Sequence, residues 1–224
     1  MIKFYFNGSP NPTKVALFLE ESGLPYEPIA IDTRKGDQFS PDYLQVNPNG
    51  KVPAIVDEGN VVFDSNAILL YLAEKSGKFA GPASARGELL SWMMFVATGV
   101  GPFCGQAVHF RHFAPEKVPY ADKRYQFEAD RHFAVLEQRL VGRPYIVGGE
   151  YTIVDMAAWG WTRMIPFILG EGAWARYPNL KRLSDEISAR PAAQKAAALK
   201  DRFTFKPDMD DAARAVMFRH LKTA

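Results

Sequence analysis

Residues Asn49 to Lys75, NGKVPAIVDEGNVVFDSNAILLYLAEK, carry the pattern that decides the fold. A short apolar run, Ala54-Ile55-Val56, follows a proline, and a second run, Val61-Val62-Phe63, ends at Asp64-Ser65. Residues 57–60, Asp-Glu-Gly-Asn, have the composition of a hairpin turn. After Ser65 the apolar residues take helical spacing, with Ala67, Ile68, Tyr71 and Leu72 expected on one face. The stretch therefore predicts a β-hairpin followed by a helix.

The residues before this stretch change period several times. Residues 2–6 (IKFYF) and 26–32 (YEPIAID) have strand character, and a helical run from Thr13 to Ser22 ends at Gly23, a predicted C-cap. Residues 40–46 hold one or two helical turns before the turn signal Asn-Pro-Asn-Gly. The order β-α-β-α-β-β-α predicts a mixed sheet covered by helices.

After Lys75 the strand signals largely stop, and the pattern is helical almost to the end. Thr152 and Asp155 are spaced as a capping box before one of these helices. We predict an α/β N-terminal domain over residues 1–76, a linker over 77–85 and an all-α domain over 86–224. The pattern of the last twenty residues does not decide between a lid and surface packing.

Composition excludes several classes of function. The chain has 224 residues and a formal net charge of +2, which gives no electrostatic case for nucleic acid or an anionic membrane. Cys104 is the only cysteine, so no internal disulfide forms and an oxidising compartment is not implied. The first residues lack the apolar stretch of a signal peptide, and no segment has the length of a membrane span. These features predict a cytoplasmic protein.

Val52-Pro53 and Asp64-Ser65 flank the hairpin and suggest a binding site. A cis bond before Pro53 would turn the Val52 backbone outward to pair with an extended peptide. Asp64 and Ser65 stand where a strand meets a helix N-terminus, which favours a carboxylate. Asp64 is suited to an α-ammonium and Ser65 to the carboxylate beside it, so the pair predicts recognition of the amino-acid end of a small peptide. The alternative is a plain helix cap.

The chain resembles the cytosolic glutathione transferases from Met1 through "YTIVDMAAWGW" and "YPNLKRLSDEISARPAAQKA". The resemblance implies a thioredoxin-like N-terminal domain, an all-helical C-terminal domain, a homodimer, and glutathione as co-substrate without a metal. It implies that Val52 and Pro53 form the cis-proline loop that pairs with glutathione, and that Asp64 and Ser65 take the γ-glutamyl group. Gln38 and Lys51 match positions for the glycyl end, and the alternative for both is a solvated surface residue.

The catalytic prediction concerns the glutathione sulfur. A free thiol has a pKa of about 8.5, so its thiolate must be stabilised at neutral pH. Ser9 and Asn11 precede and begin the first helix, where side-chain donors and the helix dipole lie together. N-capping is the alternative role for both. Tyr5 is expected to pack in the sheet.

The phrase "SPNPTK" most resembles the bacterial nu class, with Ser9 in place of a threonine and Asn11 retained. That class implies glutathione-dependent disulfide reduction, with two glutathiones and no enzyme cysteine. Arg131 matches an arginine that reaches glutathione, and its alternative is a surface ion pair. Two further functions stay open: cleavage of an aryl ether or halide by the same thiolate, and glutathione binding without catalysis. Cys104 is expected to be an inert buried thiol, and His109 and His112 to be structural.

Overall fold

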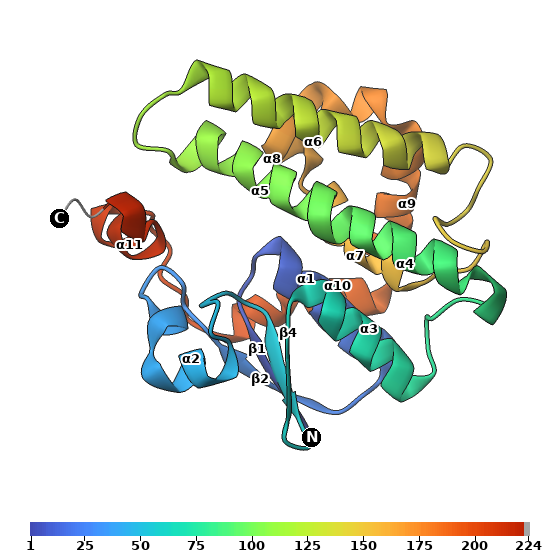
Figure 1. The fold of residues 1–224 in the computed structure, drawn as a ribbon, viewed down its shortest axis with the longest axis horizontal. Helices are drawn as coiled ribbons and strands as arrows, with labels where there is room; N and C mark the ends of the chain where they lie inside the picture. Colours follow the sequence, from blue (N-terminus) through green and yellow to red (C-terminus); the bar gives the residue numbers. More distant parts are fainter. Residues whose placement is uncertain (222–224) are drawn as a thin grey trace. The chain divides into compact units, whose positions relative to one another are not determined.

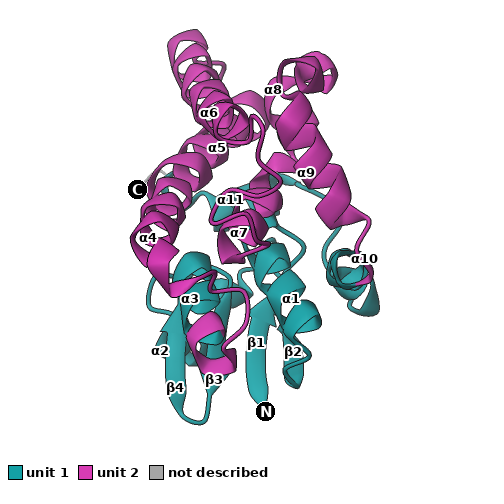
Figure 2. Cartoon of the chain, turned by 90° about the vertical axis from the view of Figure 1, so that its right-hand side faces the viewer, with its two compact units in different colours: residues 1–72, 192–224 teal, residues 73–191 magenta. Residues whose placement is uncertain are grey.

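The computed structural model describes residues 1–221, and its contacts divide the chain into two compact units. The first unit comprises Met1–Leu72 together with Ala192–Ala224, and the second is Ala73–Pro191 (Figure 2). The predicted boundary at residue 76 lies close to this division. The contacts, however, group the residues from Ala192 onward with the N-terminal sheet rather than with the helices that precede them.

The first unit is built on a mixed four-stranded sheet in the order β2-β1-β3-β4. β1 and β2 are parallel, whereas β1 with β3 and β3 with β4 are antiparallel. Helices α1 and α3 lie on one face of the sheet and α2 on the other (Figure 1). The predicted order of elements and the mixed sheet are confirmed. Their bounds are β1 Ile2–Phe6, α1 Pro10–Ser22, β2 Tyr26–Ala30, α2 Pro41–Val46, β3 Ala54–Asp57, β4 Asn60–Phe63 and α3 Ser65–Ser76.

The core of the first unit follows from the amphipathic patterns of its elements. Alternate β1 residues, Ile2, Phe4 and Phe6, are buried, as the period of a strand requires. On α3, Ile68 and Leu72 are buried as predicted, but Ala67 is exposed and Leu69 is buried. The buried face of α3 is therefore rotated from the predicted one: it includes Leu69 and leaves Ala67 exposed and Tyr71 half-buried.

The C-terminal segment returns to the first unit and packs on its sheet and on the loop after β2. The ring of Phe203 lies edge-on to Phe6, with 5.3 Å between centroids. The Lys206 N–H donates to Asp32 Oδ2 at 2.6 Å, and Arg34 Nη1 donates to the Lys206 carbonyl at 2.9 Å. This segment includes α10 (Pro191–Ala198), which begins at the boundary, and α11 (Asp211–Met217). Through these contacts the C-terminal segment holds the loop that follows β2.

The second unit is all helical, as predicted. The predicted capping box is confirmed, because Thr152 N–H donates to Asp155 Oδ2 at 2.8 Å and Val154 N–H donates to the Thr152 hydroxyl. Its α-helices are α4 Arg86–Phe95, α5 Gly101–Val108, α6 Pro119–Arg139, α7 Ile153–Thr162, α8 Ile165–Leu169 and α9 Pro178–Ser188. Two π-helical turns, Val96–Val100 and His109–Phe113, join α4 to α5 and extend α5.

The first π-helical turn ends α4 at Phe95, and it lies against α6. Gly99 in this turn lies so close to the His132 ring that an added Cβ would be 2.4 Å from its Nε2 atom. Position 99 therefore has no room for a side chain while the His132 ring lies where it does.

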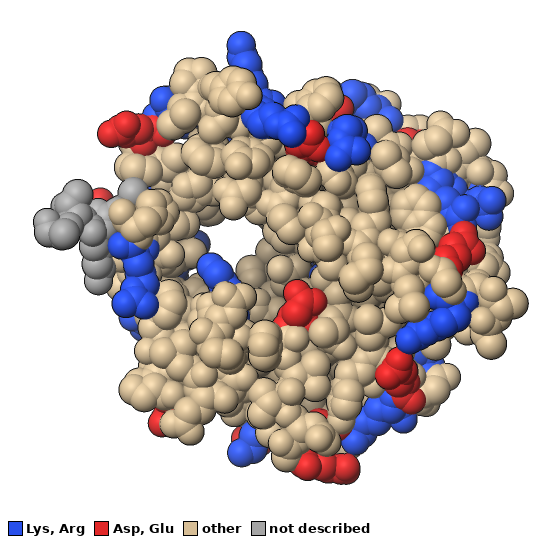
Figure 3. Space-filling model, in the orientation of Figure 1, with Lys and Arg blue, Asp and Glu red and all other residues tan. Residues whose placement is uncertain are grey.

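The surface carries charges of both signs. Figure 3 shows lysine and arginine side chains interspersed with aspartate and glutamate on the face that it draws. Within residues 1–221, no helix is both long and apolar enough to cross a bilayer.

Candidate functional site

The strand register brings the predicted site residues of the first unit to one edge of the sheet. Tyr5 pairs with Ala54, and Ala54 pairs with Phe63, so the three residues form a row across β1, β3 and β4. The chain leaves this row toward Ser9 after β1, enters it from Val52-Pro53 before β3, and leaves it toward Asp64 after β4. Ala30 ends β2 beside Phe6, so the loop that carries Gln38 starts at the same edge. Four strand ends therefore converge at one edge of the sheet.

The loop after β1 is held by Asn7. Asn7 Oδ1 accepts hydrogen bonds from the Ser9 N–H at 3.0 Å and from the Ser9 hydroxyl at 2.6 Å, and Asn7 Nδ2 donates to Thr33 Oγ1 at 3.2 Å. Ser9 stands at the N-cap position of α1, but its side chain does not cap the helix. The N-cap alternative for the Ser9 side chain is therefore wrong, and its hydroxyl proton is directed at Asn7.

Asn11 lies in the first turn of α1 between two prolines. Pro10 and Pro12 have no N–H, so of residues 10–12 Asn11 alone carries a backbone donor. The Thr13 N–H donates to the Ser9 carbonyl at 3.2 Å, as in a regular helix. Asn11 thus places its backbone N–H and its side-chain amide at the N-terminus of α1, which is also the positive end of the helix dipole.

The peptide bond between Val52 and Pro53 is cis, as the resemblance implied. Among residues 1–221, no hydrogen bond to the backbone N–H or C=O of Val52 is found. The turn before it is braced from α2, because the Tyr43 hydroxyl donates to the Lys51 carbonyl at 2.6 Å and Asn47 Nδ2 donates to the same oxygen at 2.7 Å. A half-buried backbone donor and acceptor are thus presented at the sheet edge by a rigid turn, which suits an extended peptide.

Asp64 and Ser65 begin α3, and Asp64 is its cap. Asp64 Oδ1 accepts from the N–H groups of Asn66 at 2.8 Å and Ala67 at 3.1 Å. The Asp64 backbone has φ of 69°, in the left-handed region that non-glycine residues rarely adopt. The capping alternative for Asp64 is therefore realised, but its carboxylate is exposed at the sheet edge and can act on a ligand as well. Ser65 is buried at the first position of the helix.

Gln38 and Lys51, the two residues predicted for the glycyl end, have different surroundings. Gln38 is 4% exposed, so the surface alternative is wrong for it, and its Nε2 donates to the Thr33 carbonyl at 3.2 Å. The buried Gln38 Oε1 has no hydrogen-bond partner among the described residues, an arrangement that costs free energy unless a ligand or water donates to it. Lys51 is exposed, and its backbone carbonyl is the atom braced by Tyr43 and Asn47.

Arg131 belongs to the second unit and takes part in a charged cluster on α6. Its Nε donates to Glu128 Oε2 at 2.9 Å, and Arg124 pairs with the other oxygen of that carboxylate at 2.7 Å. These arginines hold the pKa of Glu128 below its usual range, the hydrogen bond from Arg131 first. The ion-pair alternative for Arg131 is therefore realised, and its guanidinium is half-exposed.

Sequence reasoning missed Lys14 and Asn66, which link the starts of α1 and α3. Lys14 is 1% exposed, and its Nζ donates to Asn66 Oδ1 at 2.8 Å. Burial lowers the pKa of Lys14 from 10.5 to about 7, and the Asp64 carboxylate opposes that shift. A signal was available, because Lys14 shares the buried helical face of Leu17 and Phe18, where a lysine is unexpected.

The remaining candidate groups are structural. Cys104 is fully buried, and burial raises the pKa of its thiol far above the usual range, so it stays a thiol. His112 Nε2 lies 2.8 Å from the Phe167 carbonyl. Within the described part of the chain, no group of three or more His, Cys, Asp or Glu side chains is arranged to hold a metal ion.

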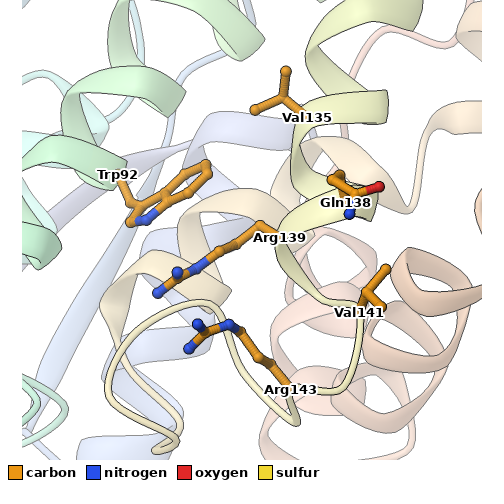
Figure 4. Close-up of a pocket in the computed structure, with 6 residues that line it drawn as sticks. All are labelled: Trp92, Val135, Gln138, Arg139, Val141 and Arg143. Atoms are coloured by element: carbon orange, nitrogen blue, oxygen red, sulfur yellow. The ribbon is translucent and has the colours of Figure 1, made fainter.

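A shallow pocket of about 450 Å³ lies in the second unit and contains none of the predicted site residues. Figure 4 shows Arg139 beside Trp92, with Arg143 extending toward the same side. Arg139 lies over the Trp92 ring at 5.4 Å, pairs with Glu88 and donates to the Ile146 carbonyl at 2.8 Å. The Arg139 guanidinium is thus engaged within the protein.

Known proteins match the chain over most of its length. The glutathione S-transferase N-terminal domain family matches residues 1–74, and the C-terminal domain family matches residues 96–191. The disulfide-bond oxidoreductase YfcG of Escherichia coli is 41% identical over 88% of this chain and 94% of its own. The disulfide-bond oxidoreductase YghU of the same organism is 37% identical, over 87% of this chain and 73% of its own.

Solved structures of glutathione transferases also match the chain. A glutathione transferase from Burkholderia graminis, with two glutathione molecules bound per subunit, superposes with a TM-score of 0.84 at 36% identity. The match covers 90% of this chain and 89% of that one. A Pseudomonas putida glutathione transferase with one glutathione disulfide bound has a TM-score of 0.82 at 33% identity, over 88% and 90% of the two chains.

Proposed function

Because the chain belongs to the glutathione S-transferase family, we propose that it is an enzyme that uses glutathione to reduce disulfide bonds, with transferase activity toward electrophiles. The observation that carries the proposal is the convergence of four strand ends at one sheet edge. There the Val52 peptide groups, the Asp64 carboxylate, the unpaired Gln38 Oε1 and the start of α1 are presented together.

Each part of glutathione has a complementary group at this edge. The N–H and C=O of Val52 pair with the cysteinyl backbone, and Asp64 and Ser65 take the α-ammonium and α-carboxylate of the γ-glutamyl group. Gln38 and Lys51 hold the glycyl end, Lys51 as a point charge for its carboxylate. This arrangement leaves the sulfur at the start of α1, where Asn11 donates to it, assisted by Ser9.

The reaction is thiol–disulfide exchange. The glutathione thiolate attacks one sulfur of a small disulfide, and the S–S bond breaks to give a mixed disulfide and a leaving thiolate that takes up a proton. A second glutathione thiolate then attacks the glutathione sulfur of the mixed disulfide, which yields glutathione disulfide and the second reduced thiol. No protein cysteine takes part, in agreement with the buried Cys104. The protein binds the two tripeptides and stabilises the attacking thiolate.

The assembly and the compartment are part of the proposal. We expect a cytoplasmic homodimer of the nu class, in which Arg131 leaves or shares its bond with Glu128 to contact glutathione. The cytoplasm supplies the reduced glutathione that the reaction consumes. Light scattering of the purified chain tests whether it is a dimer. An unchanged Kd for glutathione in Arg131→Ala would show that Arg131 does not contact glutathione.

A substrate comparison tests the activity. Purified protein with reduced glutathione is offered a hydroxyethyl disulfide, a chloronitrobenzene and a model aryl ether in parallel. We expect the disulfide to turn over with the highest kcat/KM. Faster cleavage of the aryl ether would assign the thiolate to attack on carbon instead, and binding of glutathione without turnover of any substrate would leave a binding protein.

A further inference from the structure

Lys14 is the one fully buried lysine described in this chain, and it lies between the two helices that begin at the candidate site. It occupies α1 three residues after Asn11, hence on the same side of the helix. Side chains of a helix lean toward its N-terminus, so the ammonium extends toward the start of α1. Its partner, Asn66, lies in the first turn of α3 and is 4% exposed.

The contacts of Lys14 form a short chain that ends at the candidate ligand groups. Lys14 Nζ donates to Asn66 Oδ1 at 2.8 Å, and the Asn66 N–H donates to Asp64 Oδ1, also at 2.8 Å. Asp64 is held in a left-handed backbone conformation, and Ser65 is its neighbour. The orientation of the first turn of α3 therefore depends on what holds Asn66.

Burial of this charge needs a reason. An ammonium taken out of water loses its hydration, which is costly, and a well-packed apolar residue such as methionine fills the same volume without that cost. The lowered pKa of Lys14 records the cost. Groups perturbed in this way concentrate at functional sites.

We propose that Lys14 is a positioning residue for glutathione: its buried ammonium fixes Asn66, and through Asn66 the turn that presents Asp64 and Ser65 to the γ-glutamyl group. The inference rests on the proposed glutathione site. In its protonated form, Lys14 also adds to the positive ends of the helix dipoles of α1 and α3 and favours the bound carboxylate.

Calorimetry and steady-state kinetics on four variants test this role. Lys14→Met keeps the volume and removes the charge and the donor; Asn66→Ala removes the acceptor; a third variant combines both. We expect Lys14→Met to raise the Kd and KM for reduced glutathione about tenfold, equivalent to about 1.4 kcal/mol. At saturating glutathione, kcat changes less than about twofold, because the thiolate donors are intact. The double variant binds no more weakly than the weaker single variant, because both act through one contact.

Leu17→Val is the matched control, since it removes one methylene from the same buried face of α1. We expect it to lower the melting temperature without changing the Kd. An unchanged Kd in Lys14→Met, or additive losses in the double variant, would overturn the proposal. If Lys14→Met does not fold, Asn66→Ala decides: an unchanged Kd in that variant overturns it. Parent protein that binds no glutathione would instead refute the proposed function.

Discussion

The hydroxyl of Ser9 has one proton, and the structure directs that proton at Asn7 Oδ1, 2.6 Å away. Donation to a glutathione sulfur would require Ser9 to give up this bond. Asn11 has two side-chain N–H donors and the one backbone N–H of residues 10–12. At the residue scale, Asn11 can keep one partner and still have an N–H group to donate to a thiolate, whereas the single proton of Ser9 serves Asn7 and shapes the loop.

Asn11→Ala is expected to slow turnover more than Ser9→Ala. Loss of the Asn11 amide should raise the pKa of bound glutathione by about one unit, so the thiolate fraction and the rate at neutral pH fall about fivefold. Ser9→Ala should lower the rate less than about threefold, because the Ser9 hydroxyl donates its proton to Asn7 Oδ1. The thiolate absorbance of bound glutathione, followed against pH, measures the shift. A larger shift in Ser9→Ala would reverse the two roles.

Asp64 has a structural and a ligand-binding role that two substitutions separate. Asp64→Asn keeps an oxygen to accept from Asn66 and Ala67 but removes the charge. We expect Asp64→Asn to weaken glutathione binding about tenfold or more, since a charge-assisted bond to the ammonium is lost, with little change in unfolding free energy. Asp64→Ala should lose about 1 kcal/mol of stability in addition. Parent-like affinity in Asp64→Asn would assign Asp64 to capping alone.

At the scale of elements, the sequence correctly predicted those features that depend on residues close together in the chain. The strand alternation of residues 2–6, the Gly23 C-cap and the Thr152–Asp155 capping box are all confirmed because each depends on neighbouring residues. The π-helical turn at Gly99 was not predicted, and the contact of Gly99 with His132 of α6 joins residues that no local pattern relates. The burial of Lys14 had a local signal, but its contact with Asn66 did not, because the two residues are far apart in the chain.

The capping box of α7 contains a titrating group that gives a pH-dependent stability. Burial raises the pKa of Asp155 from 3.8 to about 6, against hydrogen bonds from Ile146 and Thr152 that lower it. Between these two pH values the folded state binds more protons than the unfolded state, so the contribution of Asp155 to stability falls as pH rises from about 4 to about 6.

Asp155→Asn removes this titration. The unfolding free energy of the parent minus that of Asp155→Asn should therefore decrease by roughly 1–3 kcal/mol over the same interval and stay level above it. Urea unfolding of both proteins at a series of pH values measures the difference. A difference that is flat or increases between pH about 4 and about 6 would contradict the buried, protonated state.

At the scale of the whole molecule, the return of the C-terminal segment to the first unit was not predicted, because its contacts join residues far apart in sequence. Arg219 lies over the Phe39 ring at 4.7 Å, next to Gln38. The Phe39 ring also packs against Gly50, where an added Cβ would be 2.9 Å away. The end of the chain therefore supports the segment that carries Gln38.

A chain that ends after Pro207 tests this support. It keeps Phe203 and Lys206, with their contacts to Phe6 and Asp32, but removes α11 and Arg219. We expect faster amide exchange over residues 36–39 and a KM for glutathione about threefold higher, as for loss of one cation–π contact. Arg219→Ala in the full chain should reproduce most of the effect. Unchanged exchange in both would show that the loop is stable without the tail.

The central claim is that glutathione lies along the sheet edge with its sulfur at Asn11, and a crystal structure of the complex with reduced glutathione tests it most directly. We expect both backbone groups of Val52 to pair with the tripeptide, the γ-glutamyl group to contact Asp64 and Ser65, and the sulfur to lie within hydrogen-bond distance of Asn11. Glutathione bound elsewhere, or an empty sheet edge in crystals saturated with it, would contradict the account.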